Sequence, residues 1–462
     1  MTFSPDLAAR RFAGGLSPYV PAPRDVAAMV EGLSRPDRMA ERYPVTPYST
    51  FQDMDVESIT LRGVYKKNNG TPKGKEARAA FRQVLKDARD LMLQDQRAQI
   101  ARYMDAADGM REELGIFWTD HFTTVRTGRV DQYTELSYAE DAIRPHITGR
   151  FADMLLAAAK HPRMLLFLNQ NMSVGENSSL GKNGQKKRGI NENLAREILE
   201  LHTLGADGGY TQTDVRSFAK LLTGLNVGRD RRFVFNEHRS EPGRHTVLGV
   251  TYGRRNPGLE EIDAALNDIA RHPQTARHLA WKLLVHFVSE TPDPALMDQM
   301  AQAYLTADTQ LLPMYEVMLR HASAWEDTGL GNVKWPVHYV YSAARALGLR
   351  GQDIMELPDG RLRSAFQDRV ARMGQRLGRA VGPDGWEEAD GYWITPQAVA
   401  QRISWAMTEP SKISETLPDP RAFVDMAVGS NAPDSLRFVA SAAETQAEGV
   451  GLVLASPAFQ RR

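Results

Sequence analysis

Chemically versatile side chains are concentrated in one segment, residues 191–203, which reads Asn-Glu-Asn-Leu-Ala-Arg-Glu-Ile-Leu-Glu-Leu-His-Thr. On a helix at about 100° per residue, Asn193, Arg196, Glu197 and Glu200 share one arc, and aliphatic side chains occupy the opposite arc. Two carboxylates beside a guanidinium and an amide can supply a general acid and base, or oxygen ligands for a metal ion. A solvated face with ion pairs four residues apart gives the same pattern, so both interpretations stay open.

Several histidines are further candidates. His121 lies in the aromatic run 117–122, where it is either a proton shuttle at a pocket wall or a buried, hydrogen-bonded residue. His202 lies on the apolar arc, which favours a structural role in the core. His238 and His245 flank a predicted turn and could face each other, but two histidines do not define a zinc site. The sequence therefore predicts no metal site.

A long polar loop precedes the 191–203 segment. Residues 172–190 are rich in Gly, Ser and Asn and include the basic cluster Lys186, Lys187 and Arg188. Loops of this length are often functional, although a plain solvated connector has the same composition. If the loop is functional, we expect the basic cluster and Asn191 to bind substrate at the mouth of a cleft.

The surrounding elements are mainly helical, because helical periodicity governs most of the chain and strand-like alternation is rare. Predicted helices cover 75–106, 111–124, 131–145, 150–160, 163–170, 191–204, 212–224, 258–271, 273–289, 294–307, 311–322, 334–348, 361–378, 395–408, 420–427 and 434–445. Residues 232–252 read as strand, turn and strand, so we expect one short β-hairpin there. Thr211 and Asp214 form a variant capping box before the 212–224 helix.

Similar helix junctions recur at His161-Pro162, Arg271-His272-Pro273 and Arg320-His321-Ala322, without the fixed period of a repeat protein. The fold class is a mainly α, multi-helix globular array. Three regions are expected: an N-terminal helical region (1–110), a central core with the 191–203 segment and the hairpin (111–330), and a C-terminal helical region (331–462).

Composition excludes several classes of protein. The chain has 462 residues, 57 basic and 57 acidic side chains, and no cysteine, which rules out disulfides and thiolate chemistry. The net charge of zero gives no support to a nucleic-acid partner. No apolar run is long enough for a transmembrane segment, and no secretory signal is recognised, so we expect a cytoplasmic location. Nucleophile-elbow, phosphate-loop and dinucleotide motifs are absent from the sequence, which identifies no cofactor.

These residues resemble a large bacterial family, domain of unknown function 1800. The central match is the stretch 188–205, followed by Gly208-Gly209-Tyr210-Thr211-Gln212. Further matches are Arg11-Phe12, Phe117-Trp118, His121-Phe122, His161-Pro162, Met164-Leu165, Asp214-Val215, Thr246-Val247-Leu248-Gly249, Gly385-Trp386, Trp393 and Ser456-Pro457-Ala458-Phe459-Gln460 with Arg462. The resemblance covers nearly the whole chain. It implies an all-helical fold, a family with no assigned reaction, and members that are often exported beside a second exported family resembling sulfatases and alkaline phosphatases.

The chain departs from the family pattern at the hairpin, where Ser240, Glu241 and His245 replace an expected His-Asp pair and a lysine. The long central motif favours a polar cleft or a buried polar network over a merely solvated face. As an enzyme, the protein is expected to be a hydrolase or transferase acting on an anionic or carbohydrate-like substrate. Glu197 or Glu200 would be the general base, Arg196 an anion clamp and His121 a proton shuttle, with Asn193 beside them.

Two alternatives remain. The first is a non-catalytic binding or assembly partner of an exported phosphatase- or sulfatase-like protein, with which the chain would be exported. It predicts a flat surface patch and no enclosed cleft. The second is a purely structural motif, in which Arg196 and its neighbours hold helices together.

Overall fold

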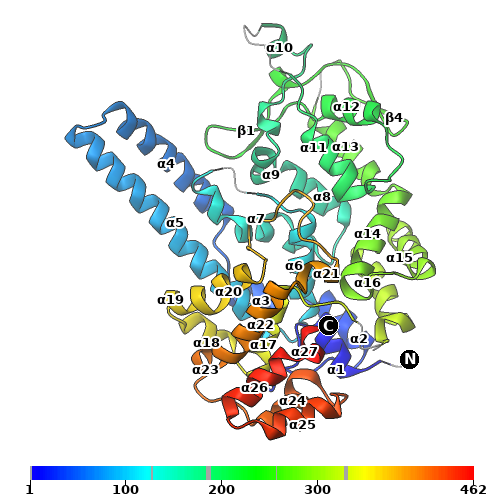
Figure 1. The fold of residues 1–462 in the computed structure, drawn as a ribbon. Coiled ribbons are helices and arrows are strands. Elements are labelled where there is room, and N and C mark those ends of the chain that lie inside the picture. The colour runs from blue at the N-terminus through cyan, green and yellow to red at the C-terminus, as the bar shows by residue number, and fades with distance from the viewer. Residues whose placement is uncertain (1–2, 126–127, 184–188, 256–257, 327–330) are drawn as a thin grey trace.

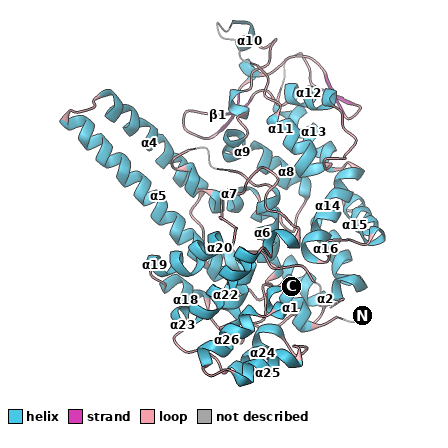
Figure 2. Ribbon diagram, viewed as in Figure 1, coloured by secondary structure: helices cyan, strands magenta, loops and turns pink. Residues whose placement is uncertain are grey.

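The computed structural model describes residues 3–125, 128–183, 189–255, 258–326 and 331–462. Helices form nearly all of its regular structure (Figure 2), which confirms the mainly α class expected from the sequence. The helix limits follow local signals: proline stands at the start of many of them, where its missing N–H costs no hydrogen bond.

The N-terminal helices are α1 (Pro5–Phe12), α2 (Val26–Ser34), α3 (Arg38–Arg42), α4 (Tyr48–Lys67) and α5 (Pro72–Asp105). The central helices are α6 (Met110–His121), η1 (Asp131–Tyr133), α7 (Glu135–Ala142), η2 (Arg144–His146), α8 (Phe151–Lys160), α9 (Pro162–Phe167), η3 (Gln170–Met172), α10 (Ser179–Asn183), α11 (Asn193–Glu197), η4 (Ile198–Thr203), α12 (Gln212–Leu221), η5 (Glu237–Arg239), α13 (Leu259–Ala270), α14 (Pro273–Phe287), α15 (Pro294–Thr306), α16 (Leu311–Arg320) and η6 (Ala322–Trp325).

The C-terminal helices are α17 (Pro336–Ala346), α18 (Gly351–Glu356), α19 (Asp359–Leu362), η7 (Arg363–Gln367), α20 (Asp368–Arg372), α21 (Asp390–Trp393), α22 (Pro396–Thr408), α23 (Pro410–Ile413), α24 (Pro420–Val428), α25 (Asp434–Ala442), α26 (Gln446–Ala455) and α27 (Pro457–Gln460).

The recurring His junctions are helix caps. The Nδ1 atoms of His161 and His272 each accept the backbone N–H two residues later at 3.2 Å, at the starts of α9 and α14. His321 does the same before η6, at 3.3 Å. In each case the histidine side chain accepts a backbone N–H that has no partner within the helix. The recurring histidines in the sequence therefore share one role, as N-caps of the helices that follow.

The strands form two short antiparallel hairpins within the described residues. β1 (Leu225–Val227) pairs with β2 (Phe233–Phe235), and β3 (His245–Val247) pairs with β4 (Val250–Tyr252). The sequence predicted one hairpin over 232–252, with its two strands paired to each other. Leu248 and Gly249, at φ of 50° and 81°, instead form the tight turn of the second hairpin, so each strand pairs with a nearer neighbour along the chain.

This pairing separates two histidines that the sequence placed face to face. His238 has its Nδ1 3.1 Å from the Ser179 hydroxyl, whereas the Nε2 of His245 lies 3.4 Å from the Glu241 carbonyl oxygen. Each therefore has its own local partner, and the expected approach across the turn is wrong.

Two large hydrophobic clusters organise the helices. One joins α1 and α2 to most of the helices between α6 and α16, and the other joins the C-terminal half of α5 to α17–α27. The antiparallel pair α4 and α5 extends away from the body of the molecule (Figure 1). Among the described helices, none is long and apolar enough to cross a membrane.

Candidate functional site

The central motif contains a π-helical turn. α11 runs without a break into η4, where the Leu204 N–H donates to the Leu199 carbonyl oxygen at 3.0 Å. The Thr203 hydroxyl likewise donates to the Ile198 carbonyl, at 2.6 Å. A π-turn has one more residue than an α-turn, and such turns are frequent at functional sites. It changes the direction of the side chains that follow residue 197.

Beside this turn lies a cleft of about 490 Å³, a size typical of small-molecule sites. Its walls come from η4 and the turn after it, the C-terminal end of α6, one face of α14, and the loop before α21. The acidic wall residues are Glu200, Asp207 and Asp384. The basic ones are Arg277 and Lys282, which lie on α14 with the exposed Trp281. His278 lies on the same helix face, and burial lowers its pKa to about 4, so its ring is neutral near pH 7.

Among the predicted site residues, Glu197 has a carboxyl group whose pKa is raised by its surroundings. Burial, then repulsion from Glu200 and Asp384, raises the pKa of Glu197 to about 7, against the opposing effect of Arg196. Burial, together with the charge of Glu200 and a hydrogen bond to it, also raises the pKa of Tyr210. Glu197 is thus close enough to feel the charges of Glu200 and Asp384, which line the cleft.

His121 contributes to the cleft wall but is almost completely buried. Its Nε2 lies 3.1 Å from the His202 carbonyl oxygen, and the His202 Nδ1 lies 2.9 Å from the His121 carbonyl oxygen. Carbonyl oxygens only accept, so each ring donates to the backbone of the other residue. Burial, and the nearby charge of Lys282, lower the pKa of His121 well below its usual value and that of His202 to about 3. Both rings are therefore neutral near pH 7.

Arg196 and Asn193 lie elsewhere. An Arg196 Nη is 3.2 Å from Glu192 and 3.0 Å from the Gln212 side-chain oxygen, and Arg196 is partly exposed. Gln212 in turn donates to Glu192 at 2.8 Å, so this surface network ties α11 to the start of α12. The Asn193 side chain is exposed. Neither residue lines the cleft with Glu200.

The predicted substrate-binding residues are only partly covered by the structure. Asn191 donates from its side-chain amide to the carbonyl oxygens of Leu168 and Asn169, at 3.1 Å each, and so anchors the start of the motif. Lys186, Lys187 and Arg188 lie outside the described residues.

The sequence did not single out the α14 side of the cleft. His278 and Lys282 stand four residues apart, and that spacing on a predicted helix was the available signal for a shared face. Asp384 lies in a loop whose position depends on tertiary contacts. The backbone N–H of Trp386 donates to both oxygens of Asp120, at 3.1 Å each, which holds this loop against the end of α6.

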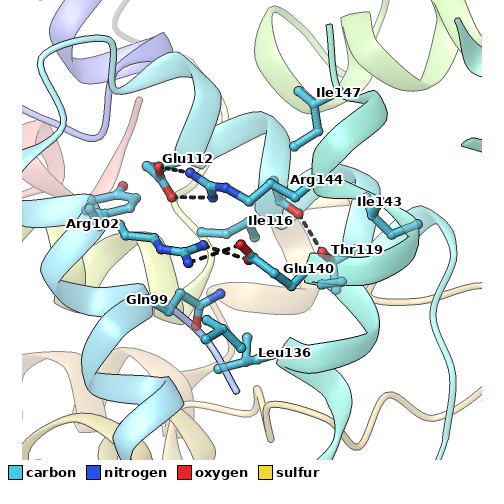
Figure 3. A pocket seen from close by; sticks show the side chains of 14 residues that line it. Gln99, Arg102, Glu112, Ile116, Thr119, Leu136, Glu140, Ile143, Arg144 and Ile147 are labelled. Atoms are coloured by element: carbon cyan, nitrogen blue, oxygen red, sulfur yellow. Dashed lines mark hydrogen bonds and ion pairs between the residues drawn. The ribbon is translucent and has the colours of Figure 1, made fainter. Parts of the chain in front are cut away.

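A smaller cavity of about 40 Å³, between α5, α6 and α7, is closed by its own ion pairs (Figure 3). Arg102 pairs with Glu140 at 2.7 Å, and Arg144 pairs with Glu112 at 2.6 Å. Because these charges satisfy one another and little space remains, the arrangement serves to join helices. Among the described residues, one trio has the arrangement of metal ligands: Glu113, His286 and His338, buried outside the larger cleft.

The fold and the cleft define a mainly helical protein whose candidate site is built on a π-turn. The family model described as "Protein of unknown function (DUF1800)" matches residues 14–461, so the chain belongs to that family. This match confirms the resemblance found in the sequence. No curated protein and no solved structure matches the chain.

Proposed function

We propose that this protein is a hydrolase that uses acid–base catalysis on a carbohydrate-like substrate bound in the cleft. The observation that carries the proposal is the pKa of Glu197, about 7, raised in part by Glu200, a carboxylate in the wall of a cleft of suitable size. A carboxyl group that is close to half-protonated near neutral pH can give and take a proton in one catalytic cycle.

The two carboxylates would have different roles. Glu197 would donate a proton to the leaving oxygen, because burial and repulsion favour its protonated form. Glu200, oriented by Tyr210, would activate the attacking water or stabilise positive charge that develops on the substrate. Such pairs of carboxylates in different environments are the usual equipment of glycoside hydrolysis.

The opposite wall would bind the substrate. Trp281 is 44% exposed and offers a flat apolar surface on which a sugar ring can stack. Lys282 lies next to it and can donate hydrogen bonds to hydroxyl or acidic groups. The His278 Nε2 lies 3.3 Å from the Leu201 carbonyl oxygen and donates to it, which leaves Nδ1 to accept a hydrogen bond. We assign His121 a positioning role, since its depressed pKa keeps the ring neutral and its N–H is committed to a carbonyl.

The alternative function, docking of an exported phosphatase- or sulfatase-like companion, expects a flat patch. A hollow of about 490 Å³ lined by acidic and basic groups supports the enzymatic alternative instead. Export or cytoplasmic retention is compatible with either function.

The test uses the purified full chain with 4-nitrophenyl glycosides of both anomers and with chitohexaose, cellohexaose and maltohexaose. We expect turnover of at least one probe, and a loss of about 100-fold or more in kcat in Glu197→Gln. Glu237→Gln, an exposed residue on η5, is the matched control and should retain full activity. Absence of both binding and turnover across these probes overturns the carbohydrate assignment, and undiminished turnover in Glu197→Gln overturns the catalytic role.

A further inference from the structure

A second polar centre lies where the two hydrophobic clusters meet. It consists of Glu113 on α6, His286 on α14 and His338 on α17, all buried. Each residue offers one ligand atom, and these atoms lie within 4.8 Å of one another. A carboxylate with two imidazoles is the ligand set found in several zinc sites.

The hydrogen bonds of the histidines leave one nitrogen of each ring available. The Nδ1 of His286 lies 3.0 Å from both carboxylate oxygens of Glu388, and the Nδ1 of His338 lies 3.0 Å from an oxygen of Glu113. The Nε2 atoms of both rings are buried and have no hydrogen-bond partner in the described part of the chain. A buried polar nitrogen without a partner is costly, and this cluster combines two of them with a carboxylate in the arrangement of metal ligands.

A further carboxylate lies beside the trio. Glu388, bonded to His286, supplies the outer carboxylate that orients a ligating histidine.

Arg462 and Lys334 are basic residues near the trio. Arg462 has an Nη atom 3.5 Å from Glu113, and neither of its Nη atoms has a hydrogen-bond partner among the described residues. Lys334 is also buried, and burial lowers its pKa well below the usual value, which reduces its charge. The carboxylates of Glu113 and Glu388 oppose the remaining positive charge.

We propose that Glu113, His286 and His338 bind one zinc-class divalent cation, which fastens α6 and α14 to α17. The role is structural, because the trio is buried and lies apart from the cleft. Phe117 separates the two sites, with its ring 5.1 Å from that of His286 and 6.4 Å from that of His121. This proposal does not depend on the proposed hydrolase activity, since it concerns a different set of residues.

The experiment measures metal binding by the full chain. The protein is stripped with a chelator, titrated with zinc chloride, and analysed for metal content and melting temperature. We expect one tightly bound zinc ion per chain and a rise in melting temperature on loading. Cobalt chloride is the second probe, since Co²⁺ held by two imidazoles and a carboxylate gives visible absorption bands. The partly exposed Glu388 side chain contacts His286 and is not itself a proposed ligand. The variant Glu388→Gln should therefore weaken zinc binding by roughly 10- to 100-fold.

His146→Gln, on η2 away from the trio, is the matched control and should bind zinc as the wild type does. His338→Gln should abolish the cobalt bands. If that variant does not fold, the wild-type stoichiometry and Glu388→Gln still decide the question. Failure of the wild-type chain to retain one zinc ion overturns the proposal, as does unchanged affinity in Glu388→Gln.

Discussion

His121 and His202 donate their ring N–H groups to each other's backbone carbonyl oxygens, at 3.1 and 2.9 Å. This reciprocal pair ties the end of α6 to the π-helical turn η4 and thereby fixes one wall of the cleft. The two rings lie 5.7 Å apart between their centroids, with Phe122 packed against both. The pair is therefore a structural element that supports the candidate site.

Replacing His202 tests this role. His202→Leu leaves the carbonyl oxygen of His121 buried without its donor, and we expect a loss of about 1–3 kcal/mol in the free energy of unfolding. His202→Asn places an amide N–H near the position of Nδ1 and should recover part of the loss. Urea denaturation followed by circular dichroism measures both values. Equal stability of the leucine variant and the wild type would show that the reciprocal bonds contribute nothing.

The same pair makes stability depend on pH. The folded pKa of His202 is about 3, below the value of 6.5 for an unperturbed histidine, so the unfolded chain binds the proton more readily. The contribution of His202 is fully present above about pH 6.5 and is lost as the pH falls toward 3. We expect the free energy of unfolding to decline across this window, and to decline less steeply in His202→Asn. Denaturation curves at several pH values provide the comparison.

Glu197 should show the opposite pH dependence. Its folded pKa of about 7 is raised above 4.5, so its favourable contribution is present below about pH 4.5 and is lost as the pH rises through 7. Glu197→Gln removes an unfavourable charge, and we expect it to stabilise the protein at pH 8 by on the order of 1 kcal/mol, allowing for solvent screening. At pH 4 the gain should vanish. A gain that is equal at both pH values would contradict the raised pKa.

Local sequence signals predicted most of the fold. Thr211 caps α12, its side chain accepting the Asp214 N–H at 3.2 Å while Asp214 accepts the Thr211 N–H at 2.9 Å, which confirms the predicted capping box. The 75–106 and 150–160 segments form α5 and α8 with nearly the predicted limits. Such signals depend on neighbouring residues alone, so the sequence reveals them. The partners of β2 and β3 depended on which turns formed, and the sequence pattern did not decide that.

The candidate site was less predictable for two physical reasons. The prediction that Arg196 and Glu200 share one arc assumed an α-helix with about 100° per residue. The structure has a π-turn at Ile198–Thr203, and its extra residue turns the Glu200 side chain away from the direction of Arg196. In addition, Lys282 and Asp384 reach the cleft from distant parts of the chain. Their approach depends on the packing of α14 and on the contact between Asp120 and the Trp386 backbone, which no local pattern reports.

Replacing Arg196 tests whether this residue belongs to a surface network or binds an anionic substrate. Its contacts with Glu192 and Gln212 are partly exposed, so Arg196→Ala should cost only about 0.5–1 kcal/mol of stability. Binding of a hexasaccharide in the cleft should be unchanged, because Arg196 faces α12. Thermal melts and isothermal titration measure the two effects. A loss of affinity at unchanged stability would instead place Arg196 in the binding site.

Trp281 provides the complementary case, in which binding changes and stability does not. The side chain is 44% exposed and stacks against His278 at a centroid distance of 5.9 Å. Trp281→Ala should therefore alter the free energy of unfolding by no more than about 0.5 kcal/mol. It should weaken binding of the recognised hexasaccharide about 10-fold or more, since the stacking surface is removed. Isothermal titration gives the affinity, and Tyr392→Ala, which removes an exposed aromatic ring outside the cleft, is the control. Equal affinity of Trp281→Ala and the wild type would exclude Trp281 as the binding platform.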